Sequence, residues 1–310
     1  MAFKKRLMSV IRDPFKIPFH LLRLYGGWIP DRQCVEWEYF FTNHRKLHLD
    51  NPVSFNEKLQ WLKLYYHKPE FTIMVDKVKA KDYVAEKIGS QYIIPAIGVW
   101  EDPDDIDFDK LPNQFVLKCN HGSGENVICK DKSQLDTEKV RKQMRKWLKR
   151  SFYKVAREWP YKDVPRRILA EKYMTDNSKT GQKDLRDYKF FCFNGEPKLC
   201  EVISDRSTVE KIDFYDMEWN RQKGLIWPIG VCGNSNHNIQ CPDSFEELKR
   251  LVKVLAKGLP FVRIDFYDIN GVPYFGEITF YPHAGYGVFY PYEWNERIGS
   301  WIKLPKKSAT

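Results

Sequence analysis

The sequence predicts an α+β protein, and two observations carry that prediction. Short alternating runs of β-branched and aromatic residues are joined by turn signals, as at 194–195 and 268–271. Among these hairpins lie amphipathic segments with helix caps, such as Ser54 followed three residues later by Glu57. Hairpins favour antiparallel sheets, and helices mixed among them without a regular strand–helix alternation are typical of the α+β class.

The predicted elements follow the chain in an irregular order. Helices are expected at 34–44, 54–65, 76–88, 136–158 and 243–258. Strands are expected at 92–100, on both sides of a glycine loop at 115–130, at 167–174, in a hairpin at 187–203, at 214–219 and in a second hairpin at 261–280. No internal repeat interrupts this series.

The composition indicates a globular protein with an acidic partner. A chain of 310 residues can bury a large core and can form two or three subdomains. The sequence contains no run of about 18 apolar residues, so no membrane-spanning helix is expected. The net charge of +10 predicts a nucleotide, an anionic sugar or an anionic lipid surface as partner. Because no RNA- or DNA-binding motif occurs, nucleic acid is not expected.

The cysteines indicate a reduced compartment. All seven are scattered without regular spacing, and no signal-peptide core is found near the basic start of the chain, so the expected location is the cytoplasm. Cys232, His237 and Cys241 are conceivable zinc ligands. Without a CxxC pair, they are better interpreted as loop residues.

Residues 1–25 form a basic segment with interleaved apolar side chains. Six lysines and arginines stand there against a single acid, Asp13. Such a segment is typical of an amphipathic helix on the inner, anionic face of a membrane. An ordinary helix that docks on the domain and is broken at Pro14 and Pro18 fits the same pattern, and the sequence leaves both alternatives open.

The stretch 261–285 concentrates the candidate chemistry. Alternation in its first strand places Arg263 and Asp265 on one face, and Glu277 and Thr279 share a face of the returning strand. Two neighbouring buried carboxylates are costly unless a cation holds them, and their oxygens suit Mg²⁺. A surface hairpin with an Arg–Asp pair and a solvated Glu is the alternative.

A second candidate lies at 115–130, where a glycine loop joins two strands. Lys118 is the only charge in the first of them. The backbone N–H groups of His121-Gly-Ser-Gly124 would suit a phosphate, although no Walker A pattern follows and a plain hairpin turn is the alternative.

The order of these segments resembles the ATP-grasp superfamily. An Asp76-Lys77 pair opens a helix, with Lys81 after it, and a lysine ends a strand before the glycine loop. A hinge strand then reads Leu-Ala-Glu-Lys-Tyr at 169–173, and Arg-Ile-Asp and Glu-Ile-Thr close the series. Within the superfamily the chain is similar to the TupA-like branch over roughly 28–300. That similarity includes 51–61 (NPVSFNEKLQW), 187–191 (DYKFF) and 276–280 (GEITF).

The resemblance implies an ATP-grasp fold, in which two α+β subdomains clamp ATP, behind a mainly helical N-terminal region. The implied boundaries are 1–72 for the helical region, 73–170 and 171–304 for the two subdomains, and 305–310 for a tail.

The resemblance also implies roles for individual residues. Lys77 and Lys118 would neutralise the ATP phosphates, with the loop from His121 to Glu125 closing over them. Arg263, with Lys118, would stabilise the transferred phosphoryl group. Thr279 stands where many relatives carry Asn as a metal ligand. The full implied set is Lys77, Lys118, His121, Gly122, Ser123, Gly124, Glu171, Lys172, Tyr173, Asp187 and Lys189 for ATP, and Asp265, Glu277 and Thr279 for Mg²⁺.

The implied activity is that of an ATP-dependent carboxylate–amine ligase working through an acyl phosphate. Its substrates would be an amino acid or other amine and a uronic acid, nucleotide- or lipid-linked, in bacterial surface polysaccharide synthesis. The candidates to line that pocket are Arg206, Arg221, His237, His283 and Tyr286.

Three alternatives remain open. An ATP-grasp sugar kinase would use the same ATP residues and form no amide. A glycosyltransferase of the same pathway would need a DxD motif, which 102–105 offers only in a Pro-containing loop that is typical of a turn or helix cap. A membrane-bound scaffold without enzymatic activity would leave the carboxylate pair unexplained.

Overall fold

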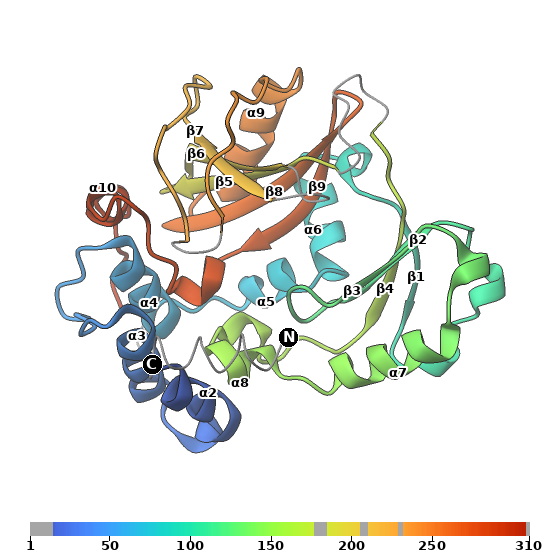
Figure 1. Ribbon diagram of the computed structural model, residues 1–310, viewed down its shortest axis with the longest axis horizontal. Helices are drawn as coiled ribbons and strands as arrows, with labels where there is room; N and C mark the ends of the chain where they lie inside the picture. The colour runs from blue at the N-terminus through green and yellow to red at the C-terminus, as the bar shows by residue number, and fades with distance from the viewer. Residues whose placement is uncertain (1–14, 177–184, 205–209, 229–231, 308–310) are drawn as a thin grey trace.

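The computed structural model describes residues 15–176, 185–204, 210–228 and 232–307 (Figure 1). Its frame is two antiparallel sheets, one of four strands and one of five. Figure 1 shows them on either side of helix α6 (Lys79–Ile88), while α2 (Lys16–Tyr25), α3 (Asp31–Asn43) and α4 (Phe55–Tyr65) gather at one end. The predicted α+β class is confirmed.

The four-stranded sheet has the order β1-β4-β2-β3. Its strands are β1 (Ala96–Trp100), β4 (Ile168–Lys172), β2 (Phe115–Cys119) and β3 (Asn126–Cys129). Helix α7 (Thr137–Leu148) packs against β2. A small apolar core that includes Phe115, Leu117 and Met144 joins the sheet to this helix. This core fixes the position of Lys118, which alternates with the buried residues of β2.

The five-stranded sheet has the order β7-β6-β5-β8-β9. Its strands are β7 (Lys211–Tyr215), β6 (Glu196–Ser204), β5 (Asp187–Phe193), β8 (Phe261–Ile269) and β9 (Val272–Thr279). Helix α9 (Phe245–Ala256) covers one face, packing on β5, β6 and β8. The large apolar core extends from this sheet to α4 through Phe55, whose ring lies edge-on to Phe261 and Phe289.

Helix α4 begins with the predicted capping box. The Ser54 hydroxyl accepts from the Glu57 N–H, and the Glu57 carboxylate accepts from the Ser54 N–H at 3.0 Å. The buried polar side of α4 faces the short turn 282–285 after β9. Helices α5 (Glu70–Val75), α8 (Phe152–Ala156) and α10 (Glu293–Trp301) and seven short 3₁₀ turns complete the described chain.

Several predicted bounds were wrong. The region 136–158 is not one helix, because α7 ends at Leu148 and Ser151 caps a separate α8 by accepting from the Lys154 N–H. The strand expected from 92 begins only at Ala96, after a 3₁₀ turn, and α3 begins at Asp31 rather than Cys34. The helix expected from 76 begins at Lys79 but ends before Gly89 as expected.

No helix in the described ranges is long and apolar enough to cross a membrane. Residues 1–14, most of the loop 175–185 and Arg206 lie outside the described residues. Cys232 and Cys241 are free thiols, and within the described ranges no cluster of three or more His, Cys, Asp and Glu side chains is arranged to hold a metal.

Candidate active site

The hairpin β8–β9 brings its four predicted polar residues together on one face. The Arg263 guanidinium donates to both oxygens of Asp265, at 2.8 and 2.7 Å. It also donates to Glu277 Oε1 at 3.0 Å and to Thr279 Oγ1 at 3.2 Å. The predicted convergence of an arginine, two carboxylates and a hydroxyl is therefore present in the structure.

A bulge at Gly276 sets this register. Asp265 pairs with Glu277, but Phe266 already pairs with Phe275, so Gly276 is the extra residue of β9. A Cβ at Gly276 would lie 3.0 Å from the Asp265 carbonyl oxygen. Glycine thus permits the close approach that keeps Glu277 on the same face as Asp265.

The neighbouring strand β5 adds Asp187 and Lys189 to the cluster. The Lys189 ammonium lies between Asp187, at 2.6 Å, and Asp265, at 2.5 Å. Burial alone would lower the pKa of Lys189, but the charges of Asp187 and Asp265 outweigh burial and raise it. Lys189 is therefore a fixed positive charge beside the predicted metal ligands.

Glu201 on β6 was missed by the sequence analysis. It lies opposite Lys189 in the register, is fully buried, and its Oε2 has no hydrogen-bond partner among the described residues. Burial raises its pKa to about 7, against the charges of Arg263 and Lys189. The available signal was a lone acid in the apolar run Leu199-Cys-Glu-Val-Ile203.

The facing sheet contributes a second charged group centred on Glu171. Lys118 from β2 and Lys81 from α6 each approach one of its carboxylate oxygens at 2.5 Å. Burial would raise the pKa of Glu171, but the two lysine charges outweigh burial and lower it. The charge of Glu171 in turn raises the pKa of Lys118 despite burial. Glu171 and Lys118 are therefore both charged at neutral pH.

Lys77 links the two halves of the site. Its ammonium donates to the Gly122 carbonyl oxygen in the glycine loop and lies 3.8 Å from Glu277 on the opposite sheet. Asp76 before it is fully buried, where it accepts from Asn120 at 2.8 Å and from Arg167 at 2.7 Å. Asp76 is thus fixed to Asn120, which directly follows β2.

A cavity of about 20 Å³ lies where these groups meet. Its lining consists of Met74, Val75, Lys77, Ala80, Lys81, Lys118, Tyr161, Glu171, Phe275, Gly276, Glu277 and Ile278. Lys81 and Tyr161 were not in the predicted set. The volume is well below the roughly 300–1,000 Å³ of ligand pockets, so the charged side chains fill most of the space between the sheets.

Other predicted nucleotide residues lie outside this cavity. The His121 ring is buried, and desolvation lowers its pKa. Ser123, Gly124 and Lys172 are exposed. Tyr173, which directly follows β4, is half-buried.

The donor set fits Mg²⁺ chemically, with a condition. Asp265 and Glu277 offer carboxylate oxygens and Thr279 a hydroxyl, which are the hard ligands that Mg²⁺ binds. All three accept hydrogen bonds from Arg263 in this structure, so a metal ion would either share these oxygens with the guanidinium or displace it. Lys77 and Arg263 outweigh burial and lower the pKa of Glu277 to about 2, which keeps it ionised for a cation.

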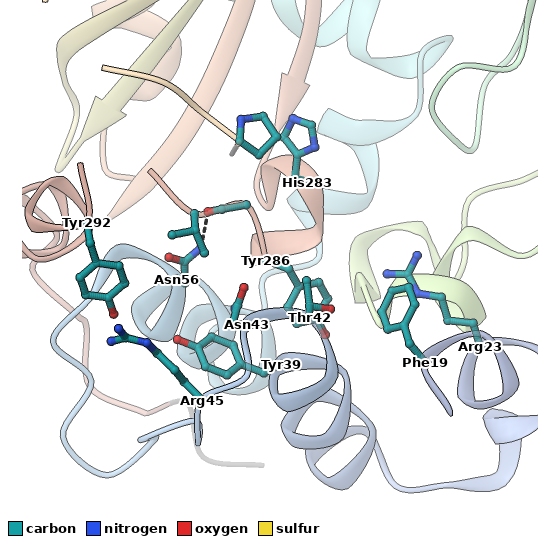
Figure 2. A pocket seen from close by; sticks show the side chains of 13 residues that line it. Phe19, Arg23, Tyr39, Thr42, Asn43, Arg45, Asn56, His283, Tyr286 and Tyr292 are labelled. Carbon is teal, nitrogen blue, oxygen red and sulfur yellow. Dashed lines mark hydrogen bonds between the residues drawn. The ribbon is translucent and has the colours of Figure 1, made fainter. Parts of the chain in front are cut away.

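The predicted substrate residues separate into two groups. Arg221 is bound to Asp213 at 2.5 Å, so it is a structural ion pair, and His237 is an exposed residue between β7 and α9. His283 and Tyr286, by contrast, line a larger pocket beside the helical region (Figure 2).

Two sheets that hold a lysine pair, a glycine loop and an Arg–Asp–Glu cluster between them define an ATP-grasp protein. The family model described as TupA-like ATPgrasp matches residues 57–303. The chain therefore belongs to the TupA-like ATP-grasp family. A search of curated proteins found no match.

Solved structures give distant similarities. The D-alanine–D-alanine ligase of Bacillus anthracis complexed with ATP is 17% identical (TM-score 0.37), over 67% of this chain and 55% of that one. The ligase of the same name from Helicobacter pylori is 14% identical (TM-score 0.43), over 83% and 68%. Phosphoribosylamine–glycine ligase of Thermotoga maritima is 13% identical (TM-score 0.39), over 80% and 55%. This chain spans little more than half the length of the first of these proteins.

Proposed function

We propose that the protein binds Mg·ATP between its two sheets and is an ATP-dependent carboxylate–amine ligase. The observation that carries the proposal is the convergence on one small cavity of Lys77 and Lys118 from one side and Glu277 from the other. A nucleoside triphosphate with its metal ion requires lysines near its phosphates and carboxylates near the metal. Family membership supports the same conclusion.

Different residues would contact different parts of the nucleotide. Lys77 and Lys118 would neutralise its phosphates, and β4 around Glu171 would meet the adenine. Asp265 and Glu277 would hold Mg²⁺, which when bound offsets the charge on the phosphates. Arg263, whose buried guanidinium already spans both carboxylates, would hold the transferred phosphoryl group.

ATP binding has to open the present contacts. Glu171 is neutralised by Lys81 and Lys118, and the cavity is too small for a nucleotide. Phosphates would replace Glu171 as the partner of Lys118, and the two sheets would move apart to admit ATP.

The reaction would run in two steps. A carboxylate oxygen of the acid attacks the γ-phosphorus, and the bond to the bridging oxygen breaks, so that ADP leaves and an acyl phosphate forms. The amine then attacks the acyl carbon and phosphate leaves with the C–O bonding pair, while the amine proton passes to solvent. Arg263 and the lysines stabilise the charge that develops in both steps.

We propose a uronic acid and an amino acid or other amine as substrates, in the synthesis of a bacterial surface polysaccharide. The excess of positive charge favours an anionic acid substrate. The TupA-like branch is named for teichuronopeptide biosynthesis, and similarity to it favours an envelope polymer.

We also propose peripheral contact with an anionic membrane. On α2 and the turn after it, Leu24, Tyr25 and Trp28 are 73%, 71% and 83% exposed. Exposed aromatic and aliphatic side chains next to a basic segment are typical of interfacial helices.

The test is ADP release from Mg·ATP in the presence of uronic acids, free and nucleotide-linked, with and without amino acids. A ligase forms ADP only when acid and amine are both present, and the product mass equals their sum minus water. ADP together with a phosphorylated sugar and no need for an amine would instead identify a kinase. Failure of Mg·ATP to bind would overturn the proposal.

A further inference from the structure

A second pocket, of about 530 Å³, lies between the helical region and the end of β9 (Figure 2). Helices α2 and α3 supply one wall, and the turn 282–285 and the segment after it supply the other. Its volume is in the range of pockets for drug-sized ligands, so it has more room than one sugar ring needs.

The lining has positive charge and no acid. Arg23 and Arg45 belong to it, whereas none of its residues is Asp or Glu. Glu38 pairs with Arg23 at 3.1 Å. Arg45 stacks over the Tyr292 ring at 4.0 Å, and no carboxylate in the described part of the chain pairs with it. An arginine placed over an aromatic ring, with no carboxylate partner among the described residues, is suited to an anionic ligand group.

The rest of the lining suits a hydroxylated ring. Tyr292 is half-buried and brings an aromatic ring and a hydroxyl to the pocket, and the buried Tyr39 packs in its wall. The Nδ2 atom of Asn43 is buried in this wall without a hydrogen-bond partner among the described residues. Aromatic faces with nearby amides and hydroxyls are the usual means of orienting a polar ring.

Among the residues that line the pocket, His283 is the one nearest in the chain to the cluster of Arg263, Asp265, Glu277 and Thr279. It follows the end of β9, the strand that carries Glu277 and Thr279, by four residues. Desolvation, followed by the charges of Arg263 and Lys189, lowers the pKa of His283 to about 4, so the neutral imidazole lies within the field of both cations.

Helix α4 holds this junction in place. Gln60 and Lys63 donate to the Ala284 carbonyl oxygen at 3.1 and 2.6 Å, and Asn56 donates to that of Gly285 at 3.2 Å. His283 and Ala284 both have positive φ, at 49° and 54°, which non-glycine residues adopt only when the surroundings impose it. Asn56 and Gln60 belong to the segment 51–61, so this segment has a role in holding the turn 282–285 that does not involve ATP.

We propose that this pocket binds the acid substrate, a sugar carboxylate that also carries a phosphate. The phosphate lies at Arg45, the ring lies beside Tyr292 and Asn43, and the carboxylate passes His283 towards Arg263. The inference rests on the proposed ligase function and assigns its acid site to residues outside the nucleotide cavity.

The test is direct binding of glucuronic acid 1-phosphate to the full chain without ATP, by calorimetry. Glucose 1-phosphate and free glucuronic acid separate the two anionic groups, and UDP- and prenyl-diphosphate-linked forms separate the two possible carriers. We expect Arg45→Gln to weaken binding of the acid phosphate at least tenfold and to leave Mg·ATP affinity unchanged. Arg297→Gln is the matched control, because Arg297 likewise stacks on an aromatic ring, that of Trp294 at 4.4 Å, away from the pocket.

A second variant, Thr42→Trp, fills the pocket from an exposed position on α3 and should abolish binding of the acid phosphate without affecting Mg·ATP. Wild-type affinity in both variants, or no binding of any sugar acid by a protein that binds Mg·ATP, would overturn the inference. Loss of Mg·ATP binding in the wild type would contradict the proposed function instead.

Discussion

Glu277 lies between the two halves of the proposed nucleotide site. It accepts from Arg263 within its own sheet and lies near Lys77, which stands between helices α5 and α6. Alternation was enough to predict that Arg263 and Asp265 share a face of the first strand and that Glu277 and Thr279 share a face of the second. That the two faces coincide depends on the register across the strands, which alternation leaves open. The partner lysines came from the resemblance, since contacts across 200 residues leave no periodic signal.

We expect Glu277→Gln to reduce Mg·ATP turnover at least a hundredfold, because an amide is a weak Mg²⁺ ligand and carries no charge. ADP release measures this, and circular dichroism should show an unchanged fold. The control is Glu246→Gln, an exposed acid on α9 that pairs with Lys249 at 2.7 Å. Retained turnover in Glu277→Gln would remove the metal assignment.

Glu201 gives a pH-dependent prediction in the absence of Mg²⁺ and ATP. Its pKa of about 7 exceeds the ordinary value of 4.5, so the folded state binds a proton that the unfolded state releases. The contribution of this proton to stability is present at low pH and is lost as pH rises towards 7 and above.

Glu201→Gln mimics the protonated acid. The variant should match the wild type near pH 5 and exceed it at pH 8 by about 1–3 kcal/mol in free energy of unfolding. Urea titrations at both pH values measure the difference. A gain that is equal at the two pH values would show that titration of Glu201 is not its cause.

At the scale of elements, the β8–β9 bulge decides whether the cluster forms. The turn chemistry predicted the hairpin, but nothing in the sequence marked Gly276 as the bulge residue, because bulges depend on cross-strand register. The break between α7 and α8 was missed for a related reason: the basic run 145–150 continues a helical pattern, and only the cap at Ser151 indicates a new start.

We expect Gly276→Ala to weaken Mg·ATP binding at least fivefold, because its Cβ would press on the Asp265 carbonyl and shift that strand. The accompanying loss of stability should be about 1–2 kcal/mol. Nucleotide titration and thermal melting measure the two effects. Gly233→Ala, where a Cβ meets nothing within 4 Å, should change neither.

At the scale of the whole molecule, the sequence pointed to the helical region but not to the pocket that it forms. The basic, apolar character of 1–25 was visible, and so was the capping box of α4. The pocket needs residues from 19 to 292 in one place, which tertiary packing alone determines.

We expect the double substitution Leu24→Glu with Trp28→Glu to release the protein from vesicles of phosphatidylglycerol and phosphatidylethanolamine. Both side chains are largely exposed, so the fold should persist while the apolar contact is replaced by repulsion. Sedimentation with vesicles measures this. Ile128→Glu, an exposed apolar position on β3, is the control, and unchanged pelleting of the double variant would contradict the membrane proposal.

Helix α2 turns Leu24 outwards while Phe19 and Arg23 line the pocket. The same helix thus contributes to two binding equilibria, one with the membrane and one with the sugar acid. If a lipid surface changes the tilt of α2, the affinity for the sugar acid changes by some factor, and reciprocity requires the sugar acid to change membrane affinity by the same factor. Where that factor strengthens binding, the coupling would retain the loaded protein at the bilayer and release the empty one, so residence time on the membrane would report substrate supply.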